Sequence, residues 1–211
     1  QHRSSPVQIP GTTWSSTFCS GYTSIAVKTD GKMWVWGDNS HGALGQNTLV
    51  GDKILSPVQV PGTTWGNSVA LNPYTQFATK TDGTLWSWGR NNFGQLGQND
   101  GVSRSSPVQI PGTTWSRVVG NQGSSSLARK TDGTLWIWGA NGGSLGLNDT
   151  AHRSSPTQLG SGTDWTDVFS TWSSAFVASK TDGSIWSWGY NTHGQLGQNS
   201  LTNYSSPIQI P

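Results

Sequence analysis

Residues 80–97 read Lys-Thr-Asp-Gly-Thr-Leu-Trp-Ser-Trp-Gly-Arg-Asn-Asn-Phe-Gly-Gln-Leu-Gly, and close versions of this stretch occur four times in the 211-residue chain. Self-similarity with a fixed period of about 50 residues indicates a repeat architecture, in which each unit buries its apolar face only against its neighbours. We therefore expect the tryptophans of the recurring Trp-x-Trp-Gly motif to be structural. They are Trp34, Trp36, Trp86, Trp88, Trp136, Trp138, Trp186 and Trp188.

The composition predicts an all-β fold. The chain contains 28 glycines and 10 prolines, and all ten of its acidic residues are Asp. Gly and Pro break helices, and Asp is a poorer helix former than the missing Glu. Short apolar runs bounded by Gly, Asn, Asp and Ser are the pattern of strands and turns. Thirteen tryptophans argue against a disordered chain, because disordered segments are poor in aromatic residues.

One hairpin is predicted in each repeat from the motif Lys-Thr-Asp-Gly. Asp-Gly between two alternating runs favours a two-residue type I′ turn. With Asp30 and Gly31 at its centre, Val27 pairs with Trp34 on one face and Met33 lies on the other. Both faces are largely apolar near the tryptophans, so we expect like neighbours to cover both. A sheet buried in this way is typical of a β-propeller blade.

Two further strands complete a predicted blade of four antiparallel strands. The Ser-Pro-x-Gln segment at 5–8 indicates an edge strand, because proline cannot donate a hydrogen bond to a neighbouring strand. The segment 14–19 indicates another strand, and the leucine of the glycine-rich loop after the hairpin is expected to point inward. With the Ser-Pro-x-Gln strand placed first, the repeats fall at about 4–54, 55–104, 105–153 and 154–204, with 205–211 starting a fifth.

The signature Trp-Gly-x-Asn-x-x-Gly-Gln-Leu-Gly, preceded by Asp-Gly-x-(Leu/Ile)-Trp, resembles the regulator of chromosome condensation repeat. The resemblance covers essentially the whole chain and implies a seven-bladed propeller, of which these four repeats form a part. Low charge and near-regular repeats resemble bacterial or bacteriophage members of the family. Members of this family commonly have a histidine shortly before the alanine of the inner strand, and this chain does not. That position holds Thr23, Thr75, Ser125 and Ala175.

Five Ser-Pro-x-Gln segments accompany only four Trp-x-Trp hairpins. Two interpretations are open: the chain continues in a longer repeat protein, or it is a half-ring that pairs with a second copy. An open arc would expose apolar faces and strand edges, which favour association.

Charge and motif spacing give no sign of catalysis. Twelve Lys and Arg against ten Asp give a net charge of +2, far from the concentrated basic face of a nucleic-acid binder. No apolar run approaches the length of about 18 residues that a membrane span needs. The four histidines and the single cysteine show no metal-ligand spacing. We expect no catalytic residue, no metal, no cofactor, no nucleic acid and no membrane insertion, and hence a protein that is not an enzyme.

The loops that vary between repeats are the predicted binding surface, because constant blades with variable loops suit recognition. Trp172 has no counterpart in the other repeats, and exposed tryptophans are enriched among interface hot spots; packing over a local gap is the alternative. His41 and His193 share one loop position, either as a paired metal or acid-base site or as a variable surface position. The candidate contact residues are Asp38, His41, Arg90, Phe93, Trp172, Tyr190 and His193.

The expected function is a non-enzymatic binding or structural module that presents these loops to another protein or a surface ligand, in an extracellular, cell-surface or virion-associated setting. The alternative is a regulatory propeller that inhibits an enzyme or promotes nucleotide exchange on a small GTPase. An exposed acidic loop cluster would favour that alternative. The loops offer only isolated aspartates, namely Asp38, Asp52, Asp100 and Asp149.

Overall fold

The computed structural model describes residues 5–48, 51, 53–72 and 74–211, which fold into four antiparallel sheets of four strands. The first sheet contains β1 (Trp14–Ser20), β2 (Thr23–Lys28), β3 (Met33–Gly37) and β4 (Ile54–Gln59), with a short 3-10 helix η1 (Ser40–Gly42) between the last two. The second contains β5 (Trp65–Leu71), β6 (Thr75–Lys80), β7 (Leu85–Gly89) and β8 (Arg104–Ile110). The third contains β9 (Trp115–Gly120), β10 (Ser125–Lys130), β11 (Leu135–Gly139) and β12 (Arg153–Gln158). The fourth contains β13 (Trp165–Ser170), β14 (Ala175–Lys180), β15 (Ile185–Gly189) and β16 (Tyr204–Gln209).

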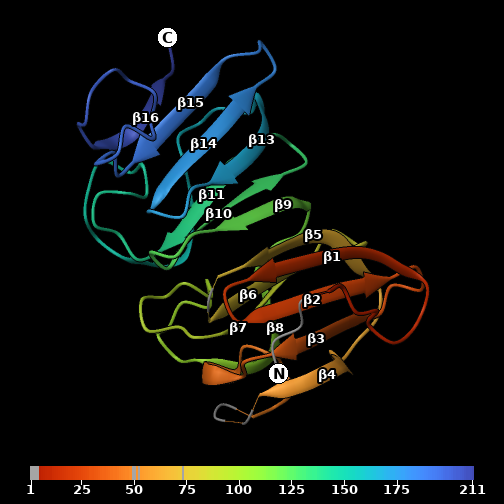
Figure 1. The fold of residues 1–211 in the computed structure, drawn as a ribbon. Coiled ribbons are helices and arrows are strands. Elements are labelled where there is room, and N and C mark those ends of the chain that lie inside the picture. Colours follow the sequence, from red (N-terminus) through yellow and green to blue (C-terminus); the bar gives the residue numbers. More distant parts are fainter. Residues whose placement is uncertain (1–4, 49–50, 52, 73) are drawn as a thin grey trace.

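The sheets follow one another along an arc of four blades (Figure 1). The first strands β1, β5, β9 and β13 contact one another in that order along the inner side of the arc. The predicted all-β architecture of four-stranded antiparallel blades is confirmed. The seven-bladed ring that the resemblance implies stays a prediction, because the chain holds four blades.

The Ser-Pro-x-Gln strand ends each sheet, whereas the sequence analysis placed it at the start of each repeat. β4 pairs with β3, and β8, β12 and β16 occupy the same place in the other sheets. The predicted boundaries at 54, 104, 153 and 204 therefore fall at the first residue of this last strand. The edge position itself is confirmed, because proline is tolerated on a strand with one unpaired side. The first such segment, at 5–8, forms no strand.

The hairpin turn contains three residues rather than the predicted two. The Gly31 N–H donates to the Lys28 carbonyl at 3.0 Å, and the Lys28 N–H donates to the Lys32 carbonyl at 2.9 Å. Gly31 has a φ of +74°, whereas Asp30 is not among the residues with positive φ. This geometry is a type I turn followed by a left-handed glycine. The Asp30 carboxylate accepts the Lys32 N–H at 3.0 Å and stabilises it, so the type I′ prediction was wrong.

Because the turn has one residue more than predicted, the side chains of β3 lie on the opposite face of the hairpin from the one predicted, relative to those of β2. Val27 pairs with Met33, and Ala26 pairs with Trp34. A register slip of one residue moves every side chain of a strand to the opposite face of the sheet. Each blade consequently has an aliphatic face and a tryptophan face. In the first blade the aliphatic face carries Ile25, Val27, Met33 and Val35, and the tryptophan face carries Trp14, Ala26, Trp34 and Trp36.

The aliphatic face of each blade packs against the tryptophan face of the next. Val35 shares a core cluster with Trp88, and Leu85 shares one with Trp138. The third interface repeats the arrangement with Ile137 against Trp188. Three similar interfaces therefore form the core, and each places a fully buried tryptophan between two blades.

The recurring lysine of each hairpin lies between two tryptophans of its own blade. Lys80 Nζ lies 4.9 Å from the ring centre of Trp65 and 4.2 Å from that of Trp86. The lysines of the other three hairpins make the same pair of contacts. Such cation–π contacts contribute about 0.5–2 kcal/mol each. The lysines therefore belong to the blade scaffold.

The tryptophans buried between blades differ in their hydrogen bonds, and the third glycine-rich loop is one residue shorter than the others. Trp88 Nε1 donates to the Ala43 carbonyl at 3.0 Å, and Trp138 Nε1 donates to the Gln95 carbonyl at 2.8 Å. The buried Nε1 of Trp188 has no partner among the described residues. The leucines of these loops are fully buried, as predicted. They are Leu44, Leu96, Leu145 and Leu196.

Acid is expected to weaken the hairpin turns. Hydrogen bonds from the Thr84 hydroxyl and N–H lower the pKa of Asp82 below its ordinary value of 3.8, and equivalent contacts lower the pKa of Asp132 and Asp182. A carboxylate with a lower pKa in the folded chain stabilises it above the unfolded pKa, and this contribution is lost as the pH falls through the folded pKa. We expect the melting temperature to fall as the pH is lowered below 3.8.

The measurement is thermal unfolding followed by circular dichroism between pH 6 and pH 2. Asp132→Asn keeps a side-chain acceptor for the turn but removes its titration, so its melting temperature should depend less steeply on pH. Equal pH profiles for the variant and the original chain would contradict this assignment.

Candidate functional site

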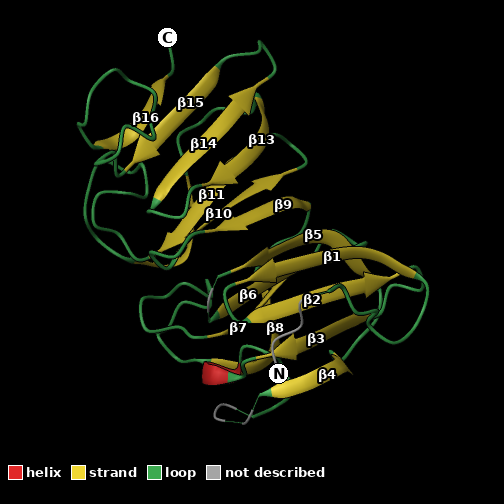
Figure 2. Cartoon of the chain, viewed as in Figure 1, coloured by secondary structure: helices red, strands yellow, loops and turns green. Residues whose placement is uncertain are grey.

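The two variable loops of each blade lie side by side at one end of the strands. The Asp38 N–H, in the loop after β3, donates to the carbonyl of Tyr22, in the turn between β1 and β2, at 2.9 Å. The other blades repeat this bond between Arg90 and Tyr74, Ala140 and Ser124, and Tyr190 and Ser174. These loops form one surface, here called the loop face, at the strand ends opposite the Asp-Gly turns (Figure 2).

A pocket at the inner side of the arc receives residues from all four blades. It has a volume of about 340 Å³ and is lined by Gly21, Asn72, Asn121 and Trp172, among others. Each of these four residues belongs to the turn between the first two strands of its blade. We call it the axial pocket, because the innermost strands end around it.

Two further pockets continue the axial pocket outward across the loop face. The middle pocket, of about 320 Å³, shares Asn72 with the axial pocket and adds Tyr74 and Arg90. The outer pocket, of about 470 Å³, shares Tyr74 with the middle pocket and adds Asp38. Tyr22 lines both the middle and the outer pocket. Adjacent pockets share lining residues, so the three form a row across the loop face from Trp172 to Asp38, here called the groove.

Two buried amides of the axial pocket have hydrogen-bonding atoms that nothing uses. Asn72 is 4% exposed, and neither its Nδ2 nor its Oδ1 has a partner among the described residues. Asn121 is 3% exposed, and its Nδ2 is equally without a partner in that part of the chain. A buried polar atom that stays unpaired costs about 1–3 kcal/mol. Unpaired amide atoms at a pocket wall are free to hydrogen-bond to a ligand or to water that enters the pocket.

Exposed aromatic side chains border the groove. Trp172 is 73% exposed and Tyr22 is 64% exposed. Large exposed aromatic rings beside buried amides combine apolar contact area with directional hydrogen bonding, as protein-contact surfaces do. Trp172 lines the axial pocket, and its contact role stays a prediction.

Charged groups of opposite sign lie at two points of the groove. Arg90 is half-buried, its Nε has no hydrogen-bond partner, and no carboxylate of the described residues forms an ion pair with it. The Asp38 carboxylate accepts the Ser40 N–H at 2.7 Å. Hydrogen bonding by the Ser40 side chain and backbone lowers the pKa of Asp38, so this carboxylate stays ionised at neutral pH. The middle pocket thus offers a free cation to an acidic ligand.

The histidine candidates lie outside the three pockets. The His41 ring lies 5.2 Å from the Tyr74 ring, edge to face. His193 Nδ1 lies 3.1 Å from Thr192 Oγ1, within its own loop. No cluster of three or more potential metal ligands occurs in the described part of the chain. The structure therefore gives no support to a paired histidine site.

The two remaining aromatic candidates pack against neighbouring loops. The Phe93 ring lies 5.4 Å from the ring of His152, edge to face, which joins the second blade to the third. The Tyr190 hydroxyl lies over Gly142, where a side chain would overlap it. Neither lines the groove, so their visible role is to connect adjacent loops.

Sequence reasoning missed the amides and tyrosines of the groove. Asn72 and Asn121 follow the innermost strand directly in their blades, and this shared position was the available signal. Asparagine is so frequent in the chain that the coincidence did not stand out. The structure also contains no helix, within its described residues, that is long and apolar enough to cross a membrane.

Solved structures with the same fold cover almost the whole chain. Human WBSCR16 superposes with a TM-score of 0.83 at 19% identity, covering 97% of this chain and 55% of that protein. Prp20p of Saccharomyces cerevisiae superposes with a TM-score of 0.83 at 20% identity, covering 98% of this chain and 53% of that one. The chain thus corresponds to about half of each of these propellers.

Curated relatives match a smaller part of the chain. Human HERC3, described as a "Probable E3 ubiquitin-protein ligase", is 32% identical over 93 residues, which are 42% of this chain and 8% of HERC3. The mitochondrial RCC1 domain-containing protein RUG3 of Arabidopsis thaliana is 31% identical over 83 residues, which are 39% of this chain and 19% of RUG3. The chain therefore spans less than a fifth of the length of either.

Family models match the repeats themselves. The model of the regulator of chromosome condensation (RCC1) repeat matches residues 30–69, 82–122 and 182–211, more than half of the chain. A second model of the same repeat matches residues 14–43. With four blades that carry the repeat signature and superpose on RCC1-type propellers, this chain belongs to the regulator of chromosome condensation (RCC1) repeat family.

Proposed function

We propose that this chain is a non-enzymatic binding module whose loop face holds a segment of another protein. The proposal rests on two buried amides beside the exposed ring of Trp172: neither side-chain atom of Asn72, and not the Nδ2 of Asn121, has a partner among the described residues. The Asn121 Oδ1 already accepts the Ser125 N–H at 3.1 Å. Side-chain amides suit the donors and acceptors of a peptide backbone, since each offers both. Arg90 suits an acidic side chain of the same segment, because a guanidinium pairs with a carboxylate through two hydrogen bonds.

Protein partners of relatives support this class of ligand. Prp20p is described by its binding properties to Gsp1p and histones, and yeast RCC1 has been solved bound to Kap60. The proposed setting is extracellular, at a cell surface or on a virion, which the low charge and the hydroxyl- and amide-rich composition support. Labelling of intact cells or particles with an antibody against the loop face tests that setting; labelling only after lysis would contradict it.

The binding test selects peptides from a random displayed library on the immobilised protein. We expect selected peptides to contain an acidic residue, and Trp172→Ala to weaken their binding about 30-fold, the effect of a 2 kcal/mol hot spot. Arg90→Gln should weaken only the peptides that carry the acid. Leu201→Ala changes an exposed side chain that lines none of the three pockets and serves as the control. Selected peptides that bind both groove variants with full affinity would contradict the assignment.

The second candidate is a regulatory propeller that inhibits an enzyme or promotes nucleotide exchange on a small GTPase, and the family relationship favours it. The acidic loop cluster that would support it does not form among the described residues. Asp100 pairs with Arg104 at 2.6 Å, and Asp149 pairs with Arg153. Asp52 lies outside the described residues. The test adds the protein to Gsp1p and to a small GTPase loaded with fluorescent guanine nucleotide; accelerated release would favour this function.

A further inference from the structure

The guanidinium of Arg90 has no partner among the described residues, although this side chain is half-buried in the wall of the middle pocket. Every other arginine of the described chain forms an ion pair or a hydrogen bond with the protein; these are Arg104, Arg117, Arg129 and Arg153. No aspartate is among the described residues that line the middle pocket, so Arg90 is the charged group of its wall. A partly buried charge without a counterion is unfavourable, and a ligand of opposite charge would compensate it.

A buried glutamine lines the same pocket with an unused donor. Gln95 is 1% exposed, its Oε1 accepts the Phe93 N–H at 2.8 Å, and its Nε2 has no partner within the described part of the chain. The glutamine at this position in the fourth blade is paired instead, because Gln195 Nε2 donates to Ser173 Oγ at 3.0 Å. The unused donor is therefore particular to the second blade and is not a property of the repeat.

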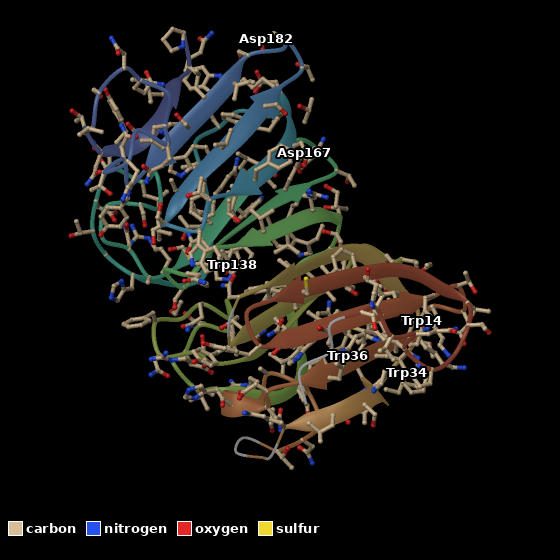
Figure 3. All side chains as sticks on the ribbon, viewed as in Figure 1. Trp14, Trp34, Trp36, Trp138, Asp167 and Asp182 are labelled. Carbon is tan, nitrogen blue, oxygen red and sulfur yellow. The ribbon has the colours of Figure 1, made fainter. Side chains whose placement is uncertain are left out.

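The interface between the second and third blades holds Gln95 and Asn72 in place without pairing their free amide atoms. Trp138, which Figure 3 labels where these two blades meet, donates its Nε1 to the Gln95 carbonyl at 2.8 Å. A Cβ on Gly120 of the third blade would overlap both amide atoms of Asn72. The other blades carry a side chain at the position of Gly120, namely Cys19, Leu71 and Ser170. The third blade thus has no side chain where the Asn72 amide lies.

The charge of this pocket favours a carboxylate over other anions. A guanidinium pairs with a carboxylate through two parallel hydrogen bonds, and its single positive charge matches the single negative charge of that group. A phosphate group carries about 1.5 to 2 negative charges at pH 7, of which Arg90 would leave a part unmatched. The carboxylate has lone pairs left for a neutral donor such as Gln95 Nε2. The unpaired Oδ1 of Asn72, which lines the same pocket, is suited to an N–H of the ligand.

We propose that the middle pocket binds a carboxylate that has an amide N–H beside it, as the last residue of a protein chain and an internal aspartate both do. The Arg90 guanidinium pairs with the carboxylate, Gln95 Nε2 donates a further hydrogen bond to it, and Asn72 Oδ1 accepts the N–H. The inference rests on the proposed function, because it assigns one pocket of the groove to one group of the protein segment held there.

The experiment titrates the protein with two small probes and follows the arginine Nε–H signals by nitrogen-15 NMR. N-acetylglycine carries a chain-terminal carboxylate, and the α-methylamide of N-acetylaspartic acid carries the aspartate side chain. We expect at least one probe to shift the signal of Arg90, identified by its absence in Arg90→Gln, and to leave the other arginine signals in place. The probe that binds more tightly identifies the source of the carboxylate. N-acetylglycinamide, which is neutral, and inorganic phosphate should bind at least about tenfold more weakly.

Variants of the three residues test each role, with folding checked by near-ultraviolet circular dichroism. Arg90→Gln and Gln95→Glu should each weaken binding of the probe about tenfold or more, the factor expected for a hydrogen bond to a charged group. Gln95→Glu keeps an oxygen for the Phe93 N–H but replaces the donor with a negative charge. Asn72→Leu should weaken binding without lowering the melting temperature, because no hydrogen bond of this side chain is lost. Arg104→Gln removes the same charge outside the three pockets and should leave the affinity unchanged.

An Arg90 signal that neither probe moves up to its solubility limit would overturn the inference. So would equal affinity for phosphate or for the neutral amide, or full affinity in both Arg90→Gln and Gln95→Glu. The displayed library separates this failure from that of the proposed function. Probes that bind while the library yields no peptide would support the carboxylate site and contradict the function. Groove-binding peptides that show no preference for a carboxylate would support the function and overturn the site.

Discussion

Replacing Trp138 with alanine is expected to lower the free energy of unfolding by about 3–5 kcal/mol, the range for removing a fully buried aromatic side chain. Trp138 is completely buried between the second and third blades. Its ring lies 5.9 Å from that of Phe77, and its Nε1 donates to the Gln95 carbonyl at 2.8 Å. Alanine would leave a cavity and remove one of the two hydrogen bonds to the Gln95 carbonyl, which also accepts the Ser126 hydroxyl at 3.4 Å. The loss is large beside the typical stability of about 5–15 kcal/mol.

Trp36→Ala is the matched control for this prediction. Trp36 has the same position in the repeat but is only half-buried on the open face of the first blade. Urea unfolding should show a much smaller loss of unfolding free energy for this variant. Equal losses for the two variants would contradict the assignment of Trp138 to an internal interface.

Gly139→Ala is expected to lower the free energy of unfolding by roughly 3–5 kcal/mol, from backbone strain and overlap together. Gly139 ends β11 with a φ of +102°, and a Cβ there would overlap the Ser124 carbonyl oxygen. That carbonyl accepts the Ala140 N–H at 3.0 Å, so the substitution also disturbs the bond that joins the two loops of the blade.

Gly143→Ala separates strain from overlap. Gly143 has a similar φ of +92°, but no atom lies within 4 Å of a Cβ at this position. We expect it to lose about 1–3 kcal/mol, from strain alone. Both values come from urea unfolding under the same conditions. A loss for Gly139→Ala no greater than that for Gly143→Ala would contradict the close approach of the two loops.

The sequence predicted the fold class because its decisive signals repeat. A period near 50 residues, a proline that recurs in the same strand of each repeat and tryptophans in fixed phase each point to like sheets stacked face to face. The turn type was not predictable from Asp30 and Gly31 alone, because Asp-Gly suits both a two-residue and a three-residue loop. The Asp30 carboxylate, which accepts the Lys32 N–H, stabilises the longer loop. The one extra residue in this longer loop decides which face of the sheet holds the tryptophans.

The candidate site was predictable only in part. Trp172 stood out because it breaks the repeat, and it lies exposed beside the axial pocket, where its contact role stays a prediction. Asn72 and Asn121 could not be recognised, because their significance lies in burial without a partner, which depends on neighbouring blades. The loop residue Phe93 looked free in the sequence but contacts His152 of the next repeat. The unpaired state of the two amides and the contact of Phe93 both depend on neighbouring blades, which the sequence of one repeat does not show.

The four blades stack face to face, with a completely buried tryptophan between each adjacent pair, and this stacking is the core of the fold. Amide hydrogen exchange of the strand tryptophans tests it most directly. The Trp65 N–H donates to the Gly31 carbonyl at 3.0 Å and the Trp115 N–H to the Gly83 carbonyl at 2.9 Å, each carbonyl belonging to the preceding blade. We predict that both amides exchange only as slowly as the whole chain unfolds. Exchange at either amide that is much faster than global unfolding would contradict the stacking of the blades.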